Sequence, residues 1–160
     1  MGQVNYWTPE YVIEPARKVL GAFDLDPASC AAANRTVNAK HYFTVEDDGL
    51  SKRWWGRVWM NHPWTAKDNP LWINKLISEY ECGHIDAAIC ITQASVNTLW
   101  FHKLFAYPIC FPKGRVNFYE HGQATSNNRY ETAITYFGPC VQAFACEFAA
   151  LGAVVMPVGV

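Results

Sequence analysis

The chain has 160 residues with 51% hydrophobic, 15% aromatic and 17% charged side chains, and its formal net charge is −1 at pH 7. This composition excludes an intrinsically disordered chain, and the balanced charge excludes the overall basic field of a non-specific nucleic-acid binder. The length, with no repeat and no evident linker, predicts a single globular domain over residues 1–160.

The spacing of the cysteines and the lengths of the apolar runs predict the cellular compartment of the protein. None of the six cysteines forms a Cys-x-x-Cys pair and the five histidines show no ligand spacing, so we expect reduced, buried thiols and no metal site. No apolar run approaches the roughly 18 residues of a membrane span, and the polar N-terminal segment does not resemble a signal peptide. The sequence therefore predicts a cytoplasmic protein with no membrane contact.

Helix and strand signals alternate along the chain. Thr8 and Pro9 are typical of a helix start, and Pro15 is expected to interrupt that helix. Beyond it we expect strands over 23–26, 57–60, 85–92, 108–111, 115–118, 132–137 and 153–158, and helices over 68–83, 95–106 and 140–152. This order predicts an α/β fold with a single open, mostly parallel sheet flanked by helices and with antiparallel C-terminal strands.

Polar residues follow three of the predicted strands. In open α/β sheets, ligands bind beyond the carboxyl ends of the strands. Asp24 and Asp26 with Pro27 end one strand, Asn61 ends the next, and residues 92–93 end a third. These strand ends are therefore the candidate ligand-binding edge.

The residue types of the tetrad Asn61, His62, Pro63 and Trp64 suit the activation of an exocyclic amine. The exocyclic amine of a nucleobase is a poor nucleophile. Its nucleophilicity rises when its two N–H groups donate hydrogen bonds to a side-chain oxygen, such as that of Asn61, and to a main-chain carbonyl. Pro63 fixes the chain direction, and Trp64 offers a flat face for an extruded base. The alternative is a simple chain turn with Trp64 in the core.

The tetrad resembles the (D/N/S)-P-P-(Y/F/W) motif of amino-group methyltransferases that act on adenine N6 or cytosine N4. A longer, ordered set of motifs is similar to the short phage-type DNA N6-adenine methyltransferases (Dam-like): YWTPEYV, FDLDPAS, YFTVEDDGLSKRWWG, the tetrad, TLWFHKLF, KGRVNF and YFG. The set covers roughly residues 7 to 138. The resemblance implies a methyltransferase (Rossmann-like) fold, S-adenosylmethionine as cofactor, DNA as partner, and protection of phage DNA from host restriction in the host cytoplasm.

The sequence departs from the wider family in two places. His62 stands where the family has proline; since its carbonyl is the acting group, we expect the ring to matter little. The glycine-rich cofactor loop is missing, as it is in the phage-type enzymes, so the resemblance assigns the cofactor to Trp7, Thr8, Pro9, Asp24, Asp26, Pro27, Ala28 and Asn61. Asp26 is the first candidate for the ribose hydroxyls and Asp24 the second.

Candidate DNA contacts are scattered along the chain. Arg53 lies in a basic and aromatic stretch, Lys113 and Arg115 flank a glycine, and Asn128 and Arg129 belong to a long polar loop over 120–131. An ordinary solvated surface is the alternative for each. The short chain leaves little room for a recognition domain, so either the recognised DNA site is short or a homodimer supplies the missing surface.

Two other functions remain open from the sequence. Cytosine N4 methylation is the nearest, because the tetrad serves either exocyclic amine. A non-catalytic nucleic-acid-binding module that retains the fold is the second, and the neutral charge and His62 are the features that favour it.

Overall fold

Seven strands form one sheet in the order β2-β1-β3-β4-β8-β5-β9 in the computed structural model, which describes residues 6–120, 123–124 and 128–159. The strands are β1 (Leu25–Asp26), β2 (His41–Tyr42), β3 (Gly56–Met60), β4 (Ile85–Gln93), β5 (Ile109–Pro112), β8 (Thr132–Phe137) and β9 (Gly152–Val155). β2, β1, β3 and β4 are mutually parallel, β8 is antiparallel to β4 and β5, and β9 is antiparallel to β5. Five of the seven strands therefore point one way, which confirms the predicted mostly parallel sheet with antiparallel C-terminal strands.

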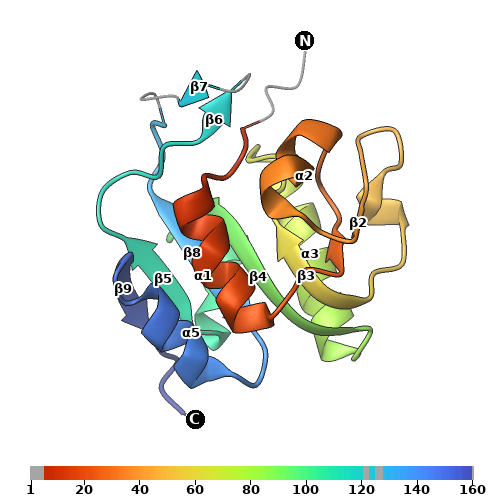
Figure 1. Ribbon diagram of the computed structural model, residues 1–160. Helices are drawn as coiled ribbons and strands as arrows, with labels where there is room; N and C mark the ends of the chain where they lie inside the picture. Colours follow the sequence, from red (N-terminus) through yellow and green to blue (C-terminus); the bar gives the residue numbers. More distant parts are fainter. Residues whose placement is uncertain (1–5, 121–122, 125–127, 160) are drawn as a thin grey trace.

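Helices cover both faces of this sheet (Figure 1). They are α1 (Glu10–Leu20), α2 (Ala31–Val37), α3 (Asp68–Glu81), α4 (Leu99–His102) and α5 (Val141–Phe148), with short 3-10 turns η1 (Gly49–Ser51) and η2 (Lys103–Ala106). α1 and α5 lie on the near face in Figure 1 and α3 on the far face. A small hairpin of β6 (Tyr119–Glu120) and β7 (Gln123–Ala124) lies outside the main sheet.

The alternation of side chains along β3 and β4 divides the core into two layers. Trp59 and Ile89 pack in the layer under α1 and α5, whereas Val58, Met60 and Cys90 pack in the layer under α3 and α4. Strands buried on both faces are typical of a parallel sheet between helices. The same alternation decides where the residues beyond β3 point.

Three local predictions were wrong. Pro15 does not interrupt α1, because burying Val12, Ile13 and Ala16 against the sheet offsets the one hydrogen bond that proline removes. Residues 115–118 form no strand: the Val116 carbonyl and the Asn117 amide are bound by side chains of Asn128 and Tyr11 instead of a neighbouring strand.

The third wrong prediction concerns the helix expected from Ser95. Residues 95–98 form turns, and α4 begins only at Leu99, where the Thr98 hydroxyl accepts a hydrogen bond from the Phe101 amide. All six cysteines are free, as expected, but only Cys90 and Cys110 are buried. Among the described residues no helix is long and apolar enough to cross a membrane.

Candidate active site

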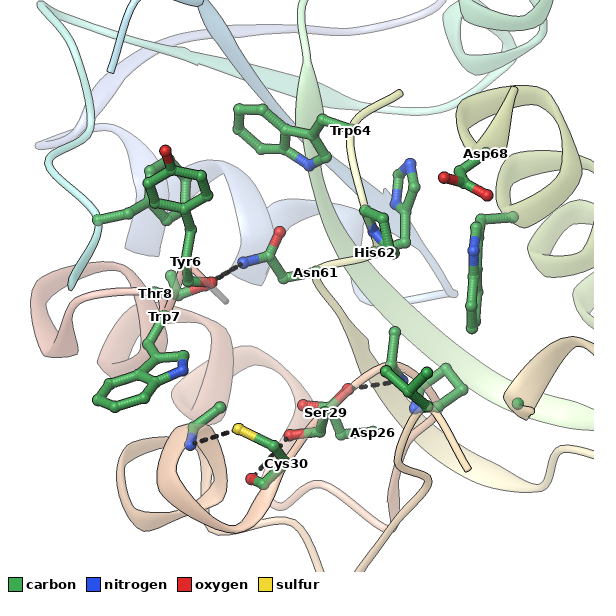
Figure 2. A pocket seen from close by; sticks show the side chains of 18 of the residues that line it. Tyr6, Trp7, Thr8, Asp26, Ser29, Cys30, Asn61, His62, Trp64 and Asp68 are labelled. Carbon is green, nitrogen blue, oxygen red and sulfur yellow. Dashed lines mark hydrogen bonds between the residues drawn. The ribbon is translucent and has the colours of Figure 1, made fainter. Parts of the chain in front are cut away.

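A cavity of about 770 Å³ lies at the carboxyl ends of β1 and β3 (Figure 2). Cofactor and small-molecule sites have volumes of roughly 300–1,000 Å³. The predicted site residues that line it are Trp7, Thr8, Asp26, Pro27, Ala28, Asn61, His62, Pro63, Trp64, Asn128 and Arg129. Those that do not line it are Pro9, Asp24, Arg53, Lys113 and Arg115.

Asn61 is held by the segment that precedes α1. Its Nδ2 donates to the Tyr6 carbonyl at 3.1 Å and to the Thr8 hydroxyl at 3.2 Å. A main-chain carbonyl can only accept, so this contact fixes which end of the amide is nitrogen. Figure 2 shows the Oδ1 atom on the opposite side, pointing away from Thr8. Asn61 therefore presents an acceptor whose orientation is set by the fold.

His62 points to the other face of the sheet, as the alternation along β3 requires. Its side chain is buried, Nε2 lies 2.9 Å from Oδ1 of Asn69, and the ring stacks on Trp72 at 6.3 Å and 27°. Burial lowers the pKa of His62 to about 4. The ring is therefore neutral at pH 7, and it is not the titratable surface group that a solvated turn would carry.

Pro63 and Trp64 continue from this point into the cavity wall. Trp64 is half-buried, and its ring meets Phe118 edge to face at 5.2 Å and 88°. Phe118 in turn contacts Tyr6, whose ring is half exposed. The rings of Trp64, Phe118 and Tyr6 therefore form an aromatic wall beside Asn61.

Trp7, Thr8 and Pro9 enter the site as an extended segment. Trp7 forms an isolated β-bridge with Tyr119, with reciprocal N–H to carbonyl bonds of 2.8 Å. Thr8 and Pro9 are buried at the start of α1. In Figure 2, Trp7 lies with Asp26 and Ser29 below Asn61, while Trp64 lies above it. We call the part of the cavity beside Trp64 the upper lobe and the part beside Asp26 the lower lobe; Asn61 lies between them.

Asp26 is the buried carboxylate of the lower lobe. It is 3% exposed, and its Oδ1 accepts a hydrogen bond from the Ala28 amide at 3.2 Å. Burial raises the pKa of Asp26 to about 7. The carboxylate is also hydrogen-bonded by the Ser29 side chain, and two partners leave part of its four acceptor sites open. A buried carboxyl group of raised pKa at the end of a strand is typical of a ligand-binding group.

Asp24 has a different environment, although it lies only two residues away. Its carboxylate accepts hydrogen bonds from the Arg57 side chain at 2.8 and 3.2 Å and from Lys40 at 2.9 Å. The Arg57 hydrogen bond holds the pKa of Asp24 well below its usual range. Gly56, with φ at 65°, leaves no room for a Cβ beside Asp24. Asp24 and Arg57 therefore serve the fold, and neither faces the cavity.

The described part of the polar loop over 128–131 closes one side of the mouth. Asn128 uses both ends of its amide, donating to the Val116 carbonyl at 2.9 Å and accepting from the Tyr130 amide at 3.0 Å. Arg115 pairs with Glu131 at 2.9 Å. These residues shape the loop, while the exposed side chains of Arg129 and Tyr130 line the mouth.

Sequence reasoning missed several lining residues. Tyr6 and Phe118 lie at the ends of the motifs YWTPEYV and KGRVNF and Tyr130 lies in the polar loop, but none of the three was predicted as a site residue. Contacts between distant segments bring them to the cavity. Asp48 also lines the cavity, beside Gly49, where a Cβ would come within 2.0 Å of the Pro27 carbonyl. This close approach places the 44–50 loop against the end of β1, a contact that the DGL motif alone does not predict.

A mostly parallel α/β sheet with an aromatic-lined cavity at the carboxyl ends of its strands is typical of the class of nucleotide- and cofactor-binding α/β domains. Residues 3–144 match the family model described as DNA N-6-adenine-methyltransferase (Dam). Because this match covers most of the sequence, the chain belongs to the DNA adenine methyltransferase family. No curated protein matches the chain.

Proposed function

We propose that this protein transfers a methyl group from S-adenosylmethionine to the N6 amine of an adenine that is rotated out of DNA into the cavity. The fixed amide of Asn61 is the observation that carries the proposal. A donor at this place would repel an N–H group, whereas the Asn61 Oδ1 atom accepts one. The family match supports adenine as the target base and DNA as the substrate.

The upper lobe has the parts for the target base. Asn61 Oδ1 and the carbonyl of His62 each accept a hydrogen bond from one N–H group of the amine. These two bonds raise the electron density on the amine nitrogen. Trp64 stacks on the extruded base, with Phe118 supporting its ring edge to face. When bound, S-adenosylmethionine supplies an electrophilic methyl group on a sulfonium centre. No side chain needs to remove a proton before transfer.

The lower lobe has the parts for the cofactor. The Asp26 carboxylate accepts hydrogen bonds from the vicinal ribose hydroxyls. It lies buried at a strand end, and its bonds to the Ala28 amide and the Ser29 side chain leave acceptor sites for them. Pro27 and Ala28 form the adjoining wall, and Trp7 and Thr8 enclose the lobe from the α1 side. The chemistry of this donor and acceptor set therefore fits the cofactor without a glycine-rich loop.

Methyl transfer from radiolabelled S-adenosylmethionine to DNA, followed by digestion and nucleoside chromatography, tests the proposal. We expect the label on N6-methyladenine. Label on N4-methylcytosine would instead select the cytosine reaction, and label retained only by an RNA substrate would exclude DNA. A well-folded protein that binds no S-adenosylmethionine by calorimetry would select a non-catalytic binding module.

Arg129 is the side chain that we propose contacts a DNA phosphate. It is exposed at the cavity mouth, and no ion pair engages it within the described residues. We expect Arg129→Ala to weaken DNA binding about tenfold and to reduce the slope of log K against log salt by about 1. Fluorescence anisotropy over a salt series measures both. Lys18→Ala, which removes a charge from the far end of α1 beside Glu147, is the matched control. Equal losses for the two variants would contradict the assignment.

A further inference from the structure

We propose that the imidazole of His62 is a positioning residue, whose neutral ring is anchored on α3 and thereby holds the His62 carbonyl at the target amine. This inference rests on the proposed function. It assigns a role to the one tetrad side chain that departs from the family motif.

The anchoring rests on two contacts of the ring with α3. Nε2 lies 2.9 Å from Oδ1 of Asn69, and the ring stacks on Trp72. Both partners are buried, and Asn69 lies in the first turn of α3, where its amide bonds to the Thr65 carbonyl at 3.0 Å. The ring therefore joins the tetrad to the first turns of the helix that follows it.

The aromatic stack continues beyond Trp72. Trp54 stacks on Trp72 at 6.2 Å and 27°, and its Nε1 donates to the Gly49 carbonyl at 2.9 Å. Gly49 belongs to the loop that lines the cavity near Asp48. The stacked rings of His62, Trp72 and Trp54 thus connect the tetrad to the 44–50 loop, which also lines the cavity.

The ring must be neutral to fill this place. Asn69 Oδ1 accepts from Nε2–H, and Nδ1 is enclosed with no hydrogen-bond partner in the described part of the chain. A proton on Nδ1 would be buried without an acceptor, which costs free energy. Among the charged groups around the ring, Asp68 on α3 favours the charged form, Asp48 is exposed on the facing loop, and Lys75 lies over the far ring of Trp54. Burial prevails over these charges and lowers the pKa of His62.

Neutrality also suits the reaction. Transfer of a methyl group from a sulfonium places positive charge on the exocyclic nitrogen until a proton leaves. A charged imidazolium on the same residue as the accepting carbonyl would oppose that charge. A proline at position 62 would keep the carbonyl but lose both contacts with α3, and an error of about 1 Å in such a group can lower a rate by about 100-fold.

Kinetics of four variants test the ring. We expect His62→Pro to lower kcat at least tenfold with the Kd for S-adenosylmethionine within about threefold of wild type. His62→Gln, whose amide can still donate to Asn69, is expected to lose less. His84→Ala is the matched control and is expected to keep wild-type kcat, because this exposed histidine precedes β4 at the end of the strands opposite to the cavity. A His62→Pro variant that folds, binds the cofactor and keeps wild-type kcat would overturn the inference.

The fourth variant, Asn69→Asp, distinguishes a positioning role of the His62 ring from a role in stability alone. A carboxylate beside Nε2 favours the charged ring, so kcat at saturating cofactor is expected to fall as pH drops from 8 to 6, while wild-type kcat changes less over this range. An unchanged pH profile for Asn69→Asp would contradict the role of the neutral ring.

Imidazole NMR separates this inference from the proposed function. Failure of wild-type protein to methylate DNA would refute the function, whereas the state of the ring is read directly from its nitrogen shifts. We expect a neutral Nε2–H ring at pH 6 and a charged one in Asn69→Asp. A His62 ring that titrates near the ordinary 6.5 would refute the anchoring, whatever the activity.

Discussion

Replacing Asn61 by alanine is expected to lower methyl transfer by about 100- to 1,000-fold, the usual cost of removing one oriented group that stabilises a transition state. The amide oxygen is the only part of Asn61 left for the substrate, because Nδ2 already donates to Tyr6 and Thr8. Single-turnover transfer to an adenine-containing duplex measures the loss. The Kd for S-adenosylmethionine is expected to change much less, by about threefold.

Two further variants decide what Asn61 does. Asn61→Asp retains an acceptor but cannot donate to the Tyr6 carbonyl, so its rate is expected to lie between wild type and Asn61→Ala. Thr8→Val removes one acceptor of Nδ2 and leaves Oδ1 untouched, and we expect less than a tenfold loss. A Thr8→Val rate as low as that of Asn61→Ala would show that Asn61 chiefly holds the N-terminal segment.

The elements that the sequence predicted well have local signals. α3 has apolar residues at helical spacing, and β4 is a buried run flanked by Gly83 and a turn. These patterns depend on residues close in sequence. The parallel order of β1, β3 and β4 followed from the alternation of such elements.

What the sequence did not predict depends on distant contacts. The bond from Asn61 to Tyr6 spans 55 residues, and Asn128 holds Val116 from 12 residues away, which replaces the strand expected over 115–118. One signal was available but unused. The alternation of β3 continues past Met60, so it places Asn61 and His62 on opposite faces, the first toward α1 and the second toward α3.

The charge environments of Asp24 and Asp26 also depend on contacts that the sequence did not predict. Two acids two residues apart in one predicted strand look equivalent in sequence. The fold gives Asp24 a guanidinium partner from Arg57, 33 residues away, and gives Asp26 the uncharged partners Ala28 and Ser29, which are its neighbours in sequence. Their pKa values therefore shift in opposite directions.

This contrast leads to the second large prediction: Asp26→Asn is expected to stabilise the free protein at pH 8 and to weaken cofactor binding. The pKa of Asp26 rises from 3.8 to about 7 on folding. Between these values the native state keeps a proton that the unfolded chain has lost, so the free energy of unfolding falls as pH rises through this window. About three pKa units correspond to at most about 4 kcal/mol.

Asparagine does not titrate, so the penalty on the charged form disappears above pH 7. We expect Asp26→Asn to gain about 1–4 kcal/mol at pH 8, with a rise in Tm of about 2–4 °C per kcal/mol, and to gain little near pH 4. Thermal unfolding at the two pH values measures this difference. Asp24→Asn is the matched control with the opposite sign: it loses its charged partners and is expected to be less stable at pH 8 by about 1–3 kcal/mol.

The affinity for the cofactor is expected to fall in Asp26→Asn, although the stability of the free protein rises. The amide offers one acceptor oxygen where the carboxylate offers two, so Asp26→Asn is expected to raise the Kd for S-adenosylmethionine about 10- to 100-fold, while Asp24→Asn leaves it near wild type. Because the ionised carboxylate is the better acceptor of ribose hydroxyls, wild-type affinity should also increase from pH 6 to 8, and that dependence should vanish in Asp26→Asn. Calorimetry at both pH values measures each effect. A Kd that is insensitive to Asp26→Asn, or more sensitive to Asp24→Asn, would remove Asp26 from the cofactor site.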